Sequence, residues 1–261
     1  MIKSFDMQDI ARRAVCPPGQ HHRFREKLDE HGFVVLQPGT DGGVDLDLDL
    51  DLDAIMSQLG EPVAYGFGTK LALQPQEGSD NLQFSTHAMP LHTDGLFNAG
   101  PAVRYIGMRC VAAPRAGGQT LIASNAAFFA HAPADLLEVL RGVTIEYRNR
   151  IPGYYRDRPE GGHPQVAPVQ DDPVTGRTRL VIGLTDPDDP MRTHDATVVG
   201  LGAKESTALL GRIKAVLHQP HVLYAHTWQP GQVIVQDNRQ VVHGRAAFPG
   251  QPRKLVRLSV A

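Results

Sequence analysis

The sequence has little cysteine, no excess of either charge and no long apolar run. Its two cysteines, Cys16 and Cys110, are too few for a disulfide framework, so a reducing cytoplasm is the expected location. A formal net charge of -2 argues against the basic surface that nucleic acids or anionic membranes require. No apolar run approaches the length of a membrane span, and the polar start Met1–Asp9 lacks the apolar core of a signal peptide. The composition therefore predicts a cytoplasmic globular protein with neither nucleic acid nor membrane as a partner.

What is present is enough to build a large core, because 41% of the 261 residues are hydrophobic. No internal repeat or linker divides the chain. We therefore expect a single domain over residues 1–261, in which residues 1–60 form an N-terminal helical and strand extension packed on the core. Many short strands with a few inserted helices predict a mostly β (α+β) protein with a double-stranded β-helix core (jelly roll, cupin-like). Assembly into a homo-oligomer is left open.

Periodicity and turn residues predict where the elements lie. Helices are expected over 5–15, 19–31, 54–59, 125–131, 134–141 and 204–218. Strands are expected over 33–36, 103–113, 119–123, 143–147, 221–228, 233–235, 241–242 and 255–260. Segment 63–101 shows little regular pattern, and 148–176 and 185–198 are expected to be loops that cover a pocket.

The tract Asp45–Asp53 alternates aspartate with leucine, and its five carboxylates repel one another. We interpret it as a solvated lead-in whose last aspartate, Asp53, caps the following helix. Calcium binding is the alternative, although calcium loops usually need glycine turns and mixed oxygen ligands.

Basic residues gather in the C-terminal part of the chain. Two apolar runs flank a polar corner at Asp237-Asn238, which is typical of two strands joined by a turn. Because strand side chains alternate, the second strand is expected to place His243 and Arg245 on one face. Arg253 precedes a third run and Arg257 lies within it. Such charge inside a sheet is costly unless it is paired or binds something, whereas a solvated basic sheet face is the alternative.

His92 and Asp94 stand two residues apart, so both side chains face the same way on an extended segment. This pair alone is a weak signal in a chain with 12 histidines. Together with the distant His243, it supplies two imidazoles and one carboxylate, the set that holds non-haem Fe(II) and leaves positions open. Ordinary hydrogen-bonded histidines in a loop and a strand are the alternative.

In chain order the sequence contains His92-x-Asp94, Gly-Gly-Gln-Thr120, Asp-Asn-Arg…His243-Gly-Arg245 and Arg253-x-x-x-Arg257. This order, over roughly residues 60–261, resembles the Fe(II)/2-oxoglutarate oxygenases of the taurine dioxygenase family. The resemblance implies that His92, Asp94 and His243 bind Fe(II), that Thr120 and Arg253 hold the cosubstrate 2-oxoglutarate, and that O₂ is the oxidant. It also implies that Arg257 faces a small anionic substrate, and Arg245 is expected to point at the same pocket. A fork-shaped guanidinium suits a planar carboxylate, which agrees with these assignments.

Within that family the chain is most similar to enzymes of the carbapenem synthase type. The similarity rests on Tyr65 before Gly-Phe-Gly and on the triplet Gly153-Tyr154-Tyr155. It implies that Tyr65 lines the substrate pocket and that Tyr155 is a catalytic hydrogen-atom donor. For either tyrosine, a place in the core or at the pocket rim is the alternative.

The resemblance implies an oxidative decarboxylation of 2-oxoglutarate to succinate and CO₂ that is coupled to oxidation of a C–H bond. Hydroxylation, desaturation and stereoinversion are the outcomes left open, and Asp94 argues against a halogenase. The expected substrate is a small, anionic, amino-acid-derived compound of a biosynthetic pathway. An alkylsulfonate or taurine-type dioxygenase and a non-catalytic metal-binding jelly-roll protein are the alternatives.

Overall fold

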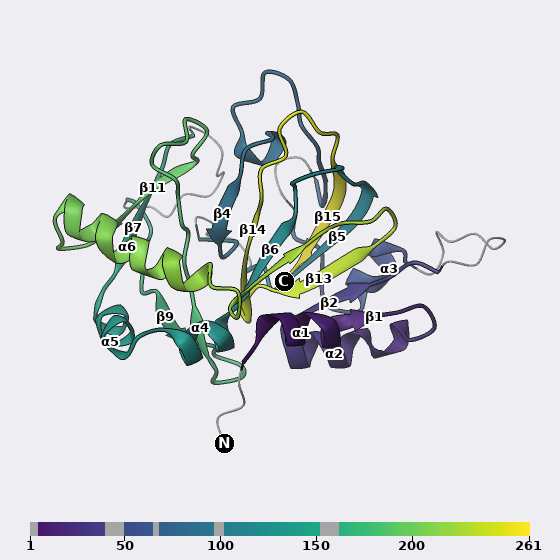
Figure 1. Cartoon of the computed structure of the whole chain (residues 1–261), viewed down its shortest axis with the longest axis horizontal. Coiled ribbons are helices and arrows are strands. Elements are labelled where there is room, and N and C mark those ends of the chain that lie inside the picture. Colours follow the sequence, from purple (N-terminus) through teal and green to yellow (C-terminus); the bar gives the residue numbers. More distant parts are fainter. Residues whose placement is uncertain (1–4, 40–49, 65–67, 97–101, 152–161) are drawn as a thin grey trace.

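Two sheets face each other across a buried apolar layer (Figure 1). The structure is a computed structural model, and it describes residues 5–39, 50–64, 68–96, 102–151 and 162–261. Within these ranges the larger sheet has, in spatial order, strands β1 (Val15–Cys16), β2 (Phe33–Leu36), β13 (Val233–Asp237), β5 (Tyr105–Ala112), β15 (Lys254–Val260) and β3 (Lys70–Leu73). The smaller sheet has strands β12 (Leu223–His226), β6 (Thr120–Ser124), β14 (Val241–Arg245) and β4 (Met89–His92). All pairings in the two sheets are antiparallel except that of β1 with β2.

Helices and short strands cover the outer faces of this pair. The helices are α1 (Met7–Ala14), α2 (Phe24–His31), α3 (Leu52–Ser57), α4 (Asn125–His131), α5 (Ala134–Gly142) and α6 (Ala203–Leu217), with 3₁₀ turns at His21–Arg23 and Leu82–Phe84. The short strands form the pair β9 (Val169–Asp171) with β10 (Thr178–Leu180), and the ladder of β11 (His194–Val198), β7 (Ile145–Asn149) and β8 (Gln165–Val166).

Strand alternation explains the layers. On β13, Ile234 points into the layer between the sheets, and Val235 points to the outer face. That outer face is covered by α2 and α3, whose Leu28 and Met56 are fully buried against it. Each such side chain contributes about 1.5–3 kcal/mol relative to an exposed one. The larger sheet is therefore buried on both faces where these helices lie.

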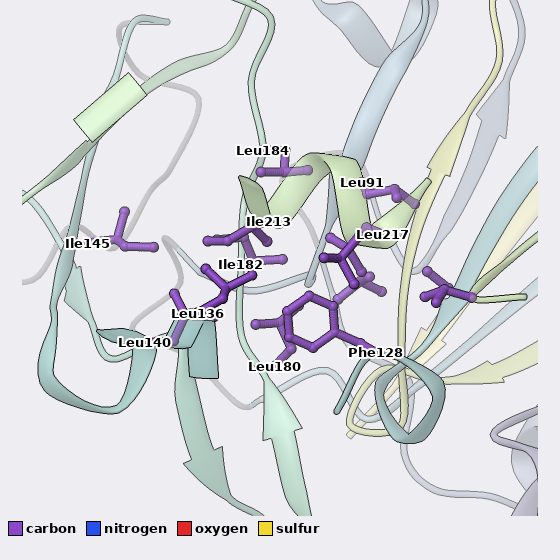
Figure 2. Packing of buried hydrophobic residues seen from close by; sticks show 14 of the residues in the cluster. Leu91, Phe128, Leu136, Leu140, Ile145, Leu180, Ile182, Leu184, Ile213 and Leu217 are labelled. Atoms are coloured by element: carbon purple, nitrogen blue, oxygen red, sulfur yellow. The ribbon is translucent and has the colours of Figure 1, made fainter. Parts of the chain in front are cut away.

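The smaller sheet is covered by α4, α5 and α6, which share a second apolar cluster (Figure 2). Phe128 of α4 lies between Leu180 and Leu217 in this cluster, and all three are buried. Leu91 of β4 belongs to the same cluster and is fully buried. This packing fixes the outer face of β4 at Leu91, one residue before the strand ends at His92.

Helix α1 closes one end of the layer between the sheets. Its residues Met7, Ile10, Ala11 and Ala14 are buried in that layer. The side-chain amide of Gln8 donates to the carbonyl of Pro220 at 3.2 Å and to that of Leu223 at 3.0 Å, which ties α1 to the start of β12. The N-terminal segment therefore contributes to the core beside the smaller sheet.

Some predicted elements were wrong in detail. Segment 63–101, expected to lack regular structure, contains β3 and β4, and the expected loop 185–198 contains β11, which pairs with β7. Residues 19–31 are a 3₁₀ turn followed by α2 rather than one helix. Asp51, not Asp53, caps α3: its side chain accepts from the backbone N–H of Asp53, because the buried Leu52 already opens the helix. The rest of the aspartate tract lies outside the described residues.

Two further expectations concern the surroundings of the protein. Both Cys16 and Cys110 are free, buried thiols, so no disulfide joins them. Among the helices of the described ranges, none combines the length and the apolar character that crossing a membrane requires.

Candidate metal and cosubstrate site

The antiparallel pairing of β4 with β14 brings two histidines together. His243 on β14 is the direct partner of His92, the last residue of β4, and the two strands lie side by side in Figure 1. The register shifts between His243 and Arg245, as in the β-bulges that often re-aim side chains next to active sites. Asp94 follows β4 by two residues and turns to the same point.

These three side chains form a compact donor set. Oδ1 of Asp94 lies 3.4 Å from Nε2 of His92 and 3.9 Å from Nε2 of His243. The two imidazole centroids are 4.4 Å apart, and the candidate ligand atoms all lie within 4.8 Å of one another. Two imidazoles and one carboxylate from separate elements match the ligand set of non-haem Fe(II). The residues therefore fit a divalent iron.

The orientation of His92 and the pKa of His243 suit metal binding. Nδ1 of His92 lies 2.9 Å from the carbonyl oxygen of Pro90, which can only accept, so this nitrogen carries a hydrogen and Nε2 is the ring atom that faces the cluster. Burial lowers the pKa of His243 to about 3, and the neighbouring His92 adds to the effect. Its Nδ1 is buried without a hydrogen-bond partner in the described part of the chain. At neutral pH His243 is uncharged, as a ligand must be.

Asp94 is held from two sides. Its backbone N–H donates to Oδ1 of Asn238 at 2.9 Å, while Nδ2 of Asn238 donates to the carbonyls of Asp94 and Val103 at 3.1 and 3.0 Å. Arg257 forms an ion pair with the second carboxylate oxygen, Oδ2. Burial alone would raise the pKa of Asp94, but the positive charge of Arg257 outweighs it, so the pKa lies well below its ordinary value. The carboxylate is therefore ionised.

Thr120 and Arg253 lie in the same interior. Thr120 pairs with Arg245 across β6 and β14, and its Oγ1 accepts a hydrogen bond from the indole N–H of Trp228 at 2.9 Å. Arg253 donates through Nε to the carbonyl of Gly118 at 3.1 Å. Both Thr120 and Arg253 are buried, and Arg253 has no carboxylate within salt-bridge distance among the described residues. Burial lowers the pKa of Arg253 to about 10, so it stays charged and suits an anionic ligand.

Arg245 is also buried, and both of its Nη groups have partners, whereas its Nε has none in the described part of the chain. Its Nη1 donates to the carbonyl of Gln83 at 3.1 Å, and its Nη2 donates to those of Leu82 and His87 at 3.0 and 2.7 Å. Burial lowers its pKa to about 9, and Arg253 adds to this, because both guanidiniums stack near the ring of Phe248. The contacts fasten segment 82–87 to β14. A role of Arg245 in substrate binding stays a prediction.

The structure thus brings together most residues predicted from the sequence: His92, Asp94, His243, Thr120, Arg245, Arg253 and Arg257. Tyr65 and Tyr155 lie outside the described residues. Asn238 and Trp228 were missed as site residues. The sequence does place Asn238 at a hairpin corner, but nothing local indicates that this corner reaches Asp94 across the fold.

Two imidazoles and a carboxylate, with a buried guanidinium that has no carboxylate partner among the described residues, indicate a class: mononuclear non-haem iron proteins with an anionic cosubstrate. The family model described as "Taurine catabolism dioxygenase TauD, TfdA family" matches residues 11–259. The chain belongs to this family, as the motif order predicted. It is an Fe(II)/2-oxoglutarate-dependent oxygenase that uses O₂, so the non-catalytic alternative is wrong. The closer likeness to carbapenem synthase stays a prediction.

Two curated relatives come from isonitrile chemistry. The 3-((Z)-2-isocyanoethenyl)-1H-indole synthase of Fischerella ambigua is 27% identical over 223 residues, which cover 84% of this chain and 78% of the relative. The tyrosine isonitrile desaturase of Pseudomonas aeruginosa is 28% identical over 212 residues, which cover 77% and 69%.

Solved structures show the same fold. PvcB, described as an Fe, alpha-ketoglutarate dependent oxygenase from an isonitrile synthetic pathway, superposes with a TM-score of 0.69 at 23% identity, covering 94% of this chain and 85% of that one. A taurine dioxygenase from Burkholderia xenovorans gives a TM-score of 0.65 at 20% identity, covering 93% and 81%.

Proposed function

We propose that this enzyme oxidises the side chain of an amino-acid-derived isonitrile in a natural-product pathway, with desaturation as the reaction. The observation that carries the oxygenase chemistry is the cluster of His92, Asp94 and His243. The substrate class rests on the two relatives above, which act in isonitrile chemistry by their names. The two facing sheets form the double-stranded β-helix of one oxygenase domain, a proposal supported by the family match over residues 11–259.

Within this proposal the metal ligands are His92, Asp94 and His243. The iron, when bound, couples the decarboxylation of 2-oxoglutarate by O₂ to the removal of hydrogen from the substrate. In a desaturation, 2-oxoglutarate and O₂ become succinate and CO₂, and two hydrogens of the substrate leave with the remaining oxygen atom as water. The residues of the chain orient the reactants and exclude water.

Arg253 and Thr120 bind the distal carboxylate of 2-oxoglutarate. Nε of Arg253 donates to the carbonyl of Gly118. This hydrogen bond orients the guanidinium and leaves its two Nη groups for a ligand. The indole N–H of Trp228 can only donate, so Oγ1 of Thr120 is the acceptor there and its own hydroxyl hydrogen is directed elsewhere. A carboxylate is the partner that suits both groups.

The test is succinate formation by the Fe(II)-loaded enzyme across a panel of small acids. The panel contains the isonitriles derived from tyrosine and tryptophan, the parent amino acids, and taurine. We expect succinate to accumulate in step with a desaturated product only for an isonitrile. Coupled turnover of taurine instead would support the alkylsulfonate alternative, and coupled turnover of a parent amino acid would show that the isonitrile group is not required.

Cosubstrate binding can be tested separately, before any turnover is measured. Anaerobic addition of Fe(II) and 2-oxoglutarate is expected to give a weak visible charge-transfer band from the chelate. Absence of this band from correctly folded protein would contradict the assignment of the metal ligands.

A further inference from the structure

Arg257 lies on the inner face of β15 and is directed at a metal-ligand residue. Its Nη2 forms the ion pair with Oδ2 of Asp94, and the two side chains are only 11% and 14% exposed. Nε and Nη2 also donate to Oγ of Ser259, at 3.2 and 3.1 Å, and Ser259 is fully buried. The sequence had suggested instead that Arg257 faces an anionic substrate.

The two oxygens of Asp94 are divided between different partners. Oδ1 faces the imidazoles of His92 and His243, at 3.4 and 3.9 Å, whereas Oδ2 faces Arg257. A carboxylate that is free to rotate can bind a metal through both oxygens and so occupy a position that the reactants need. A guanidinium on Oδ2 prevents that rotation, because the fork of donors is itself fixed by Ser259.

We propose that Arg257 is a positioning residue for Asp94: it holds Oδ1 toward the metal centre and keeps Oδ2 away from it. The inference rests on the proposed assignment of Asp94 as a metal ligand. The backbone of Asp94 is already fixed by Asn238, so Arg257 supplies the restraint that the side chain still lacks.

The consequence concerns substrate recognition. Of the three arginines in the C-terminal motifs, Arg245 is committed to backbone carbonyls, Arg257 to Asp94, and Arg253 faces the proposed cosubstrate position. If Arg257 is engaged by Asp94 in this way, it is not the residue that meets the charge of a substrate anion.

The test measures metal binding in the absence of substrate and cosubstrate. Metal-free protein is titrated with Co(II), and binding is followed by its absorption bands and by calorimetry. Arg257→Gln is expected to weaken Co(II) affinity on the order of 10–100-fold, the range for loss of a residue that orients a ligand. Lys254→Gln, which removes the same charge from the same strand, is the control and should leave the affinity unchanged.

Two milder variants keep the test decisive if Arg257→Gln folds poorly. Arg257→Lys retains the charge without the fork, and Ser259→Ala retains the guanidinium without its anchor. Both are expected to weaken Co(II) binding by less than Arg257→Gln does, in proteins whose circular dichroism and melting match the wild type.

Two results would overturn the inference, and they differ from each other. If Arg257→Gln binds Co(II) as tightly as the wild type while the substrate KM rises at constant kcat, then Arg257 is a substrate residue. If the wild-type protein itself fails to bind Co(II), the metal centre is wrong, and the role of Arg257 falls with it.

Discussion

At the scale of single residues, three arginines of the C-terminal motifs have three different sets of partners. Arg245 donates to backbone carbonyls, and Arg257 forms an ion pair with Asp94. Arg253 donates through one nitrogen to the carbonyl of Gly118. A buried guanidinium without a counter-charge is costly, so the position of Arg253 indicates a ligand that carries negative charge. The contacts that each arginine makes in the fold, rather than its place in the sequence motif, distinguish the roles of the three arginines.

Replacing Arg253 by Leu should abolish 2-oxoglutarate binding at concentrations that saturate the wild type. The loss of one partner of a buried charge pair typically costs about 2–5 kcal/mol, which is roughly 30- to several-thousand-fold in affinity. The readout is the emission of Trp228, the single tryptophan, whose indole N–H contacts Thr120. Arg253→Lys serves as the charge-retaining control and is expected to bind more weakly than the wild type but detectably. An unchanged affinity of Arg253→Leu would refute the cosubstrate assignment.

The contact of Asn238 with the backbone of Asp94 becomes visible only in the folded structure. Its side chain makes three hydrogen bonds, two of them to the backbone of Asp94, and it is buried. Asn238→Ala should lower the free energy of unfolding by about 1–3 kcal/mol and weaken Co(II) binding, because buried backbone groups lose their partners. Asn149→Ala, which removes only contacts local to Ile151, is the control. Denaturant melts and Co(II) titrations check both, and equal metal affinity in the two variants would contradict a role for Asn238 at the site.

At the scale of elements, the site depends on how closely β4 and β14 approach. Gly244 lies between His243 and Arg245, where the register shifts, and a Cβ there would stand 2.6 Å from the carbonyl oxygen of Met89 and 3.2 Å from the amide nitrogen of Leu91. These are backbone atoms of β4, which cannot move aside without moving the strand. Glycine is therefore required at this position for the two histidines to meet.

Gly244→Ala should push β4 away from β14 and weaken Co(II) binding by more than tenfold, with a loss of stability of about 1–3 kcal/mol from overpacking. Gly211→Ala is the matched control: a Cβ there meets nothing within 4 Å, and the residue lies inside α6. That change should leave metal binding intact and stabilise the protein by about 1 kcal/mol. If Gly244→Ala binds Co(II) normally, the close approach of the strands is not what assembles the site.

The sequence indicates elements where a pattern is long and local. Helix α6 and strands β13 and β15 were expected within a few residues of their ends, because their apolar positions repeat over a full element. The candidate metal ligands were predicted from the combination of His92-x-Asp94 with the distant His243 and from the motif order of the family. Strand β4 escaped prediction, since four residues that include Pro90 carry no alternation, and β11 escaped because its partner β7 decides its pairing. Contacts such as Asn238 with Asp94 join distant segments and leave no local signal.

At the scale of the whole molecule, the layer between the sheets combines apolar packing with polar groups that must stay neutral. His226 on β12 is buried there: its Nδ1 lies 3.0 Å from the hydroxyl of Tyr224, and its Nε2 lies 3.1 Å from Oε1 of Gln232. The amide oxygen only accepts, so Nε2 carries the hydrogen, and Nδ1 accepts from Tyr224. The ring then stacks edge-on against Trp228, with centroids 4.8 Å apart. A neutral His226 thus supports the side chain that contacts Thr120.

This neutrality makes the stability of the folded protein depend on pH. Burial lowers the pKa of His226 from 6.5 to about 4, so between these values the unfolded chain binds more protons than the folded one. The free energy of unfolding should therefore fall as the pH drops from about 6.5 to about 4, by up to about 1.4 kcal/mol per pH unit from this residue. His226→Gln cannot titrate, and in urea melts of metal-free protein its stability should decline less steeply in that window, while the two curves run parallel above pH 7. Because both proteins contain the same metal-ligand residues, the contributions of these residues to the pH dependence of the free energy of unfolding cancel in the difference.

If the two stability curves stay parallel down to pH 4, His226 protonates as easily in the folded protein as in the unfolded chain. That result would show that the layer beside Trp228 is not closed to water.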